Sequence, residues 1–86
     1  MIRDADFTRE AIRAMIGEGA ITLGGNAVLK IYGSLGCRSG KRMDRANRVF
    51  FAGEAEAIAL GYRPCGHCLR PKYGRWLALQ PPPRPS

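Results

Sequence analysis

The stretch RPCGHCLR, residues 63–70, holds two cysteines on either side of Gly66 and His67. A C-x-x-C pair is typical of two chemistries: thiol–disulfide exchange in thioredoxin-like proteins, and zinc chelation by two thiolates. The redox interpretation needs a parallel strand–helix–strand unit before the motif and more sheet after it. Because this motif lies close to the C-terminus, the sequence favours the metal interpretation, and redox chemistry stays the less favoured alternative.

A third cysteine, Cys37, lies upstream of the pair. An odd number of cysteines argues against a secreted disulfide scaffold. The start MIRDADFTRE is charged where a signal peptide is apolar, and no stretch approaches the roughly 18 apolar residues of a membrane span. We therefore expect a cytoplasmic protein in which Cys37, Cys65 and Cys68 converge on one zinc ion, with a metal-free fold as the alternative.

The chain has 86 residues, 45% of them hydrophobic, which suits one small folded domain. A core of this size often needs a metal or a disulfide as a staple. We expect a single domain over residues 1–80, followed by a disordered proline-rich tail, PPPRPS, over 81–86.

Hydrophobic periodicity predicts the elements before the first cysteine. Apolar residues recur at spacings of three and four over 6–17, which predicts a helix capped by Asp4 or Asp6. AITL and AVLKIY then flank Gly24, Gly25 and Asn26, which predicts a β-hairpin turning at these three residues. We expect a loop with one short helical turn over 33–48.

Strand and helix signals continue after this loop. VFF, residues 49–51, predicts a short strand, and GEAEAIAL predicts a helix ended by Gly61. A last helix starts near Cys65 or Pro71 and is expected to turn its aromatic face inward. The fold class is therefore α/β (α+β): a small, mostly antiparallel sheet flanked by helices.

The excess of positive charge lies entirely after Cys37. The formal net charge is +7, and acidic and basic residues balance up to Cys37. Basic charge around the cysteines favours a polyanion, most simply the phosphate backbone of DNA, over a generic soluble surface. The candidate phosphate contacts are Arg38, Lys41, Arg42, Arg45, Arg48 and Arg63. We expect Tyr32, Tyr73 and Trp76 to pack in the core rather than to stack on bases.

Three blocks between Ile31 and Tyr73 resemble a known family: YGSLGCRSGK, NRVFFAGEAEAIALGYRPCGHC and LRPKY. They are similar to the N-terminal metal-binding domain of the bacterial Ada DNA-repair protein. That domain has a C-R-P-S-C loop, an N-V-x-F-F-like strand, a helix with E-A, and a G-[FY]-R-P-C-x-x-C motif. About half of the chain is covered.

The resemblance implies a site and an activity. In that family, four cysteines hold zinc, and the first accepts a methyl group from a DNA methylphosphotriester in a stoichiometric reaction. By position, Cys37 matches the methyl acceptor, and Cys65 and Cys68 match the C-terminal pair. The second loop cysteine falls on Lys41, which departs from the family pattern.

The departure at Lys41 leaves the fourth ligand open. A lysine ammonium cannot bind zinc unless it loses its proton, so His67, Asp44 or a water molecule would complete the site. Three thiolates leave the zinc complex a charge of −1 rather than −2, which makes Cys37 a weaker nucleophile.

Two functions of different classes follow. The first is a zinc-binding module that contacts DNA phosphates, with methyl acceptance by Cys37 as its sharper form. The second is a non-catalytic, zinc-stapled domain that binds a protein partner or regulates one. The substitution at Lys41 favours a binding domain over a suicidal methyl acceptor.

Overall fold

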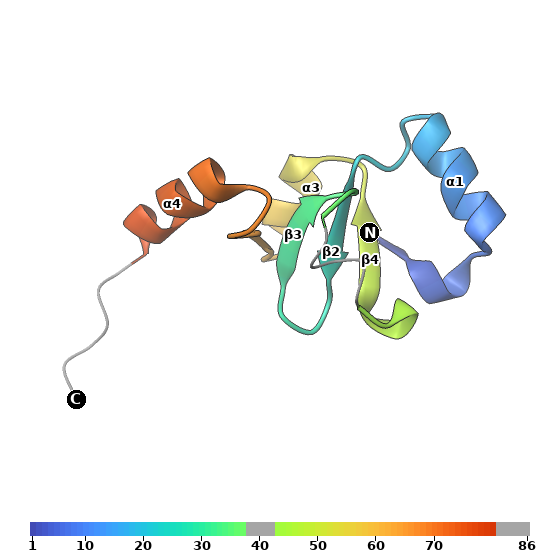
Figure 1. Ribbon diagram of the computed structural model, residues 1–86, viewed down its shortest axis with the longest axis horizontal. Helices are drawn as coiled ribbons and strands as arrows, with labels where there is room; N and C mark the ends of the chain where they lie inside the picture. The colour runs from blue at the N-terminus through green and yellow to red at the C-terminus, as the bar shows by residue number, and fades with distance from the viewer. Residues whose placement is uncertain (38–42, 81–86) are drawn as a thin grey trace.

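The computed structural model describes residues 1–37 and 43–80 (Figure 1). Within them, five strands form one sheet in the order β1-β4-β2-β3-β5. Every neighbouring pair is antiparallel except β3 and β5. The strands are β1 (Ile2–Arg3), β2 (Leu23–Asn26), β3 (Ile31–Ser34), β4 (Arg48–Phe51) and β5 (Arg63–Pro64). The helices are α1 (Arg9–Gly17), α3 (Glu54–Ala59) and α4 (Arg70–Leu79), with 3-10 turns η1 (Asp4–Asp6) and η2 (Arg45–Asn47). The predicted α+β class with a mostly antiparallel sheet is confirmed.

The β2–β3 hairpin forms, but its turn is not where the sequence predicted it. Gly24, Gly25 and Asn26 belong to β2, and the chain turns over residues 27–30. The Asn26 side chain holds this turn, because its Oδ1 accepts from the amides of Val28 at 2.9 Å and Leu29 at 3.1 Å.

Gly25 is required by packing and not by a turn. A Cβ at this position would lie 2.8 Å from Cε2 of Phe51 and 2.9 Å from the carbonyl oxygen of Ile31. No side chain fits there. Gly25 therefore allows close packing within the sheet.

Side chains of adjacent residues on β4 enter two separate apolar clusters, as the alternation of a strand requires. Val49 and Phe51 pack with Tyr32, Ala57 and Tyr62 in the first cluster. Phe50 packs on the other side with Ile12 of α1 and Ile21. The sheet is thus covered by α3 on one face and by α1 on part of the other.

The predicted helices form with shorter bounds. The first was expected over 6–17 behind Asp4 or Asp6, but these two residues lie in η1. Thr8 is the N-cap of α1 instead, and its Oγ1 accepts from the amide of Ala11 at 3.1 Å. Gly61 ends α3 with a φ of 87°, as predicted.

The last helix does not pack as the sequence predicted. α4 begins at Arg70 and accommodates Pro71 in its first turn, but it contains no buried residue. Figure 1 shows it extending away from the sheet. Tyr32 is in the core, whereas Tyr73 and Trp76 are only half-buried, so the predicted inward aromatic face is wrong for these two.

Some expectations concern other parts of the chain. The tail at 81–86 lies outside the described residues, and so do Arg38, Lys41 and Arg42. The single domain over 1–80 stays a prediction. In the described segments, none of the helices has the length and apolar character needed to cross a membrane.

Candidate metal centre

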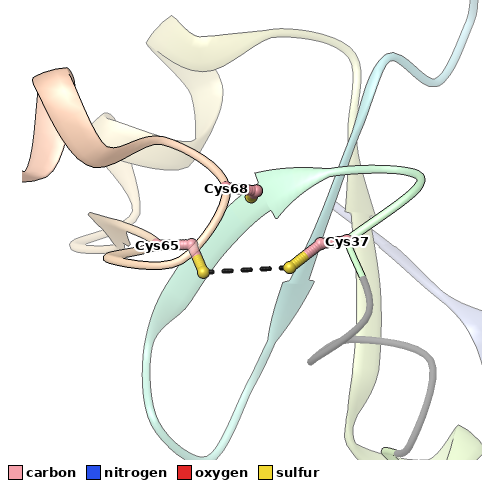
Figure 2. Close-up of side chains that lie close together, drawn as sticks. All are labelled: Cys37, Cys65 and Cys68. Atoms are coloured by element: carbon pink, nitrogen blue, oxygen red, sulfur yellow. Dashed lines mark hydrogen bonds between the residues drawn. The ribbon is translucent and has the colours of Figure 1, made fainter.

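Three thiols from distant parts of the sequence meet at one edge of the sheet (Figure 2). The Sγ atoms of Cys37, Cys65 and Cys68 all lie within 4.8 Å of one another. Cys37 Sγ is 3.9 Å from Cys65 Sγ. Cys37 is buried, with 8% of its surface exposed, and the other two are half-buried.

Strand pairing places these cysteines. The parallel pairing of β5 with β3 continues past Pro64, since the amide of Cys65 donates to the carbonyl of Tyr32 at 2.8 Å. Cys65 and Cys68 then lie in the turn between β5 and α4. Cys37 follows β3 and its amide donates to Ser34 O at 3.2 Å. The motif therefore sits beside a mostly antiparallel sheet, unlike the parallel unit that the redox interpretation needs.

Gly33 of β3 makes room for the C-x-x-C turn. A Cβ at Gly33 would lie 2.8 Å from Cys68 Sγ and 3.2 Å from Cys65 Cβ. Sequence reasoning overlooked this residue, although an isolated glycine inside a strand is a known signal of close approach by another segment.

Backbone amides point at two of the sulfurs. Ser34 N–H donates to Cys68 Sγ, and His67 N–H donates to Cys65 Sγ, both at 3.4 Å. Donors of this kind stabilise negative charge on sulfur. The imidazole of His67 is exposed and does not join the thiol cluster.

The pKa of the Cys68 thiol reflects its crowded surroundings. Burial raises it, the hydrogen bonds from Ser34 lower it in part, and Cys37 and Cys65 raise it further. Each thiol that loses its proton makes deprotonation of the next one less favourable, so the three thiols do not readily carry several negative charges without a cation. A bound cation reverses this balance, so metal binding here is linked to proton release.

The cluster fits a zinc ion on two counts. Sulfur ligands at the usual Zn–S distance of about 2.3 Å in a tetrahedron are about 3.8 Å apart, and the Cys37–Cys65 separation is 3.9 Å. The donors are thiols, which zinc prefers. Within the described ranges, no histidine or carboxylate joins them, and the exposed Asp44 stays outside the cluster.

A hollow of about 260 Å³ opens beside Cys37 and Cys65. Gly24 contributes no side chain to it, although a Cβ there would meet nothing closer than 3.9 Å. The hollow is further lined by Asn26, Ile31, Leu35, Met43, Arg48 and Phe50. Cys37 and Cys65 therefore border this hollow, whereas Cys68 does not line it.

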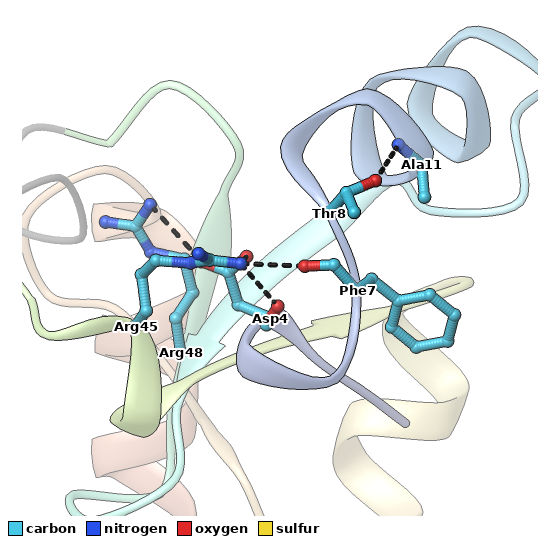
Figure 3. Close-up of polar contacts among 6 residues, drawn as sticks. All are labelled: Asp4, Phe7, Thr8, Ala11, Arg45 and Arg48. Atoms are coloured by element: carbon cyan, nitrogen blue, oxygen red, sulfur yellow. Dashed lines mark hydrogen bonds and ion pairs between the residues drawn. The ribbon is translucent and has the colours of Figure 1, made fainter.

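Two of the predicted phosphate contacts are engaged with the N-terminal segment (Figure 3). Arg45 Nη2 donates to the carbonyls of Asp4 at 3.0 Å and Phe7 at 2.7 Å, and lies 3.5 Å from Asp4 Oδ1. Arg48 Nη1 lies 3.9 Å from Asp4 Oδ2. Asp4 is only 5% exposed, so both arginines compensate a buried carboxylate.

Arg63 has aromatic neighbours. Its guanidinium lies over the rings of Tyr73 and Trp76, at 5.0 Å and 5.5 Å from their centroids. Its Nη1 donates to Pro64 O at 3.2 Å. Arg63 lies on β5 and Arg48 on β4, with β2 and β3 between these strands in the sheet. The remaining predicted contacts lie in 38–42, outside the described part.

Comparison with known proteins finds one family. The model described as the metal binding domain of Ada matches residues 21–71, from the residues before β2 to the start of α4. Neither a curated protein sequence nor a solved structure matches the chain. The match includes all three cysteines and Gly33, whereas α1 and nearly all of α4 lie beyond it.

Proposed function

The chain belongs to the family of the Ada metal-binding domain, and from that premise we propose that Cys37, Cys65 and Cys68 bind one zinc ion in a module that contacts DNA through its phosphates. The observation that carries the proposal is the convergence of three thiols within 4.8 Å beside an open hollow. The family makes this a zinc-binding module; the ligand set, the DNA contact and any chemistry are proposed.

In its sharper form, the proposal makes Cys37 a methyl acceptor. The Cys37 sulfur, without its proton, attacks the methyl carbon of a methylphosphotriester. A carbon–sulfur bond forms, the carbon–oxygen bond breaks, and its electron pair stays on the phosphate oxygen, which restores a phosphodiester. Bound zinc would keep the thiols deprotonated and nucleophilic at neutral pH.

The chain's own groups support this step. Cys37 and Cys65 line the hollow, and the glycine backbone of β2 and β3 leaves space for a methyl group there. Arg48 also lines it and offers a cationic group to a phosphate. A phosphate held at Arg48 would place its methyl group near sulfur and not in bulk water.

Mass spectrometry tests methyl transfer directly. The zinc-loaded protein is incubated with duplex DNA that carries methylphosphotriesters, then digested and weighed. Methyl acceptance predicts the gain of one methyl group on the peptide that contains Cys37, and none in Cys37→Ser. Unmodified DNA of the same sequence is the control. No gain in the wild type would eliminate this step.

A second candidate function is a protein-binding domain whose fold zinc stabilises. The contacts of Asp4 with Arg45 and Arg48, which we call the Asp4 network, favour it. Arg45 and Arg48 neutralise a buried carboxylate, which reduces the charge they offer to DNA. Salt separates the two functions, because affinity for a phosphate backbone falls steeply as salt rises. No binding to duplex DNA at low salt would favour the protein partner.

A further inference from the structure

An aromatic surface lies next to the cysteine turn, on the helix that the family match barely reaches. Tyr73 and Trp76 are nearly parallel, with centroids 5.9 Å apart and an angle of 17° between their planes. The guanidinium of Arg63 lies over both rings. We call these three side chains the Arg63–Tyr73–Trp76 stack.

The stack is not part of the core. Neither ring is among the buried residues, and α4 extends from the sheet with no buried residue of its own (Figure 1). An aromatic pair that only supported the fold would be expected inside one of the two apolar clusters. Both clusters consist of other residues.

The charge around the stack is positive. The sequence of α4, RPKYGRWLAL, has three basic residues and no acidic one. Lys72 is neutralised by its ion pair with Glu54, while Arg70 makes no ion pair in the described part of the chain. The exposed Arg75 lies one residue before Trp76. Flat side chains beside arginines match the bases and phosphates of a nucleic acid.

The stack is attached to the cysteine turn. A Cβ on Gly66, between the two cysteines, would lie 3.0 Å from Cδ2 of Tyr73 and 3.1 Å from its Cε2. The Tyr73 ring therefore packs directly on the turn that holds Cys65 and Cys68. Nucleic acid bound at the stack would lie beside the metal centre.

We propose that the Arg63–Tyr73–Trp76 stack binds unpaired nucleotides of DNA, with a base stacked on the side of the guanidinium that faces away from the rings and its phosphates on Arg70 and Arg75. The proposal rests on the proposed DNA binding and extends it. The hollow beside Cys37 serves a phosphate of the backbone, whereas the stack recognises a base that has left the duplex. It gives the protein a preference for single-stranded or locally opened DNA.

Trp76 is the only tryptophan in the sequence and reports on the stack directly. The zinc-loaded protein is titrated at low salt with a 12-nucleotide oligothymidylate and with a single-stranded abasic deoxyribose phosphate of the same length. The proposal predicts quenching of Trp76 fluorescence by oligothymidylate, and weaker binding of the abasic strand. Equal affinity for the two strands would overturn it, because phosphate charge alone would then account for binding.

Variants test the same surface with a labelled oligothymidylate and fluorescence anisotropy. Trp76→Leu and Arg63→Gln should each lose at least about fivefold in affinity, the lower end expected for one stacked base. Arg13→Gln removes the same charge from the exposed face of α1 and should bind like the wild type. Circular dichroism checks that each variant is folded.

Two outcomes count against the stack. Wild-type affinity in folded Trp76→Leu would overturn the proposal, as would equal binding of an acidic peptide of matched charge, which would mark a protein-binding surface. Methyl transfer to Cys37 is scored separately with duplex DNA. If Trp76→Leu loses single-strand binding but keeps methyl transfer, the substitution has impaired the stack and left the metal centre intact.

Discussion

Gly33 shows how a missing side chain shapes the thiol cluster. Its Cα faces the sulfur of Cys68, where a Cβ would approach to 2.8 Å. Gly24, one strand away, tolerates a Cβ with no contact closer than 3.9 Å. The two glycines therefore differ in the space available, although both lie in strands.

Gly33→Ala should weaken zinc binding by displacing Cys68. A perturbed neighbour of a metal ligand typically costs about 10–100-fold in metal affinity, and we expect a loss in that range. Competition with a chromophoric chelator measures it. Gly24→Ala is the matched control and should bind zinc like the wild type. Equal affinities in Gly33→Ala and Gly24→Ala would contradict the tight approach at Gly33.

Arg45→Ala should destabilise the fold. The substitution removes hydrogen bonds to the carbonyls of Asp4 and Phe7 and leaves a carboxylate that is 5% exposed with Arg48 as its ion-pair partner. We expect a loss of about 1–3 kcal/mol in the free energy of unfolding.

Urea unfolding measures this loss. Arg9→Ala, on the exposed side of α1, should stay within about 0.5 kcal/mol of the wild type. If Arg45→Ala were as stable as Arg9→Ala, the Asp4 network would have no structural role, and Arg45 would return to the candidate DNA contacts.

At the scale of elements, local sequence predicts most of the helices and strands, but it does not predict how they are placed relative to one another. The spacing of apolar residues in α1 and the short VFF strand predicted their elements, because periodicity reflects the face that each element buries. The sequence prediction misplaced the hairpin turn because Gly24 and Gly25 pair with β3 and β4 within the sheet. Such pairing is a tertiary contact, which local sequence does not show. The outward position of Tyr73 and Trp76 likewise depends on where α4 leaves the sheet.

A hydrogen-bonded chain links three elements: Tyr32 OH of β3 donates to Glu54 Oε2 of α3 at 3.1 Å, and Lys72 of α4 donates to the same oxygen. Burial, then the hydrogen bond to Glu54 and its charge, raises the pKa of Tyr32 to about 12 from 10.0. Because the folded value is above the unfolded one, the stabilisation is complete below pH 10 and is lost as pH rises toward 12.

The alkaline titration of tyrosine absorbance checks this link. The wild type should show a tyrosine that ionises near pH 12 and is lost in Tyr32→Phe, which keeps Tyr62, whose pKa burial also raises. The free energy of unfolding of the wild type should fall between pH 10 and 12. Glu54→Gln should move the late ionisation to lower pH, since the carboxylate charge is lost. An unchanged titration in both variants would contradict the assignment.

At the scale of the whole molecule, the metal centre lies where the segments that follow the paired strands β3 and β5 meet. Cys37 follows β3, and Cys65 and Cys68 precede α4, so one ion would tie together both ends of a long stretch of chain. The cysteine pattern allowed this convergence to be predicted from sequence. The fourth ligand could not be, because the sequence contains no fourth cysteine and the described residues add no other donor to the cluster.

Removal of the metal should therefore destabilise the whole domain. Ligand binding to the native state alone adds about 4 kcal/mol to the free energy of unfolding when the free metal is a thousand times its Kd. We expect a chelator to lower the Tm and zinc to restore it, measured by circular dichroism. A Tm that the chelator leaves unchanged would mean that the fold is independent of the metal.

Cys37, Cys65 and Cys68 are proposed to hold one zinc ion, and the metal content of single variants tests this directly. Native mass spectrometry of the purified protein and of Cys37→Ser, Cys65→Ser, Cys68→Ser and His67→Ala counts the metal in each chain. We expect one zinc ion in the wild type and in His67→Ala, and zinc binding that is lost or greatly weakened in each cysteine variant. A metal-free wild type, or full zinc occupancy in any of the cysteine variants, would contradict it.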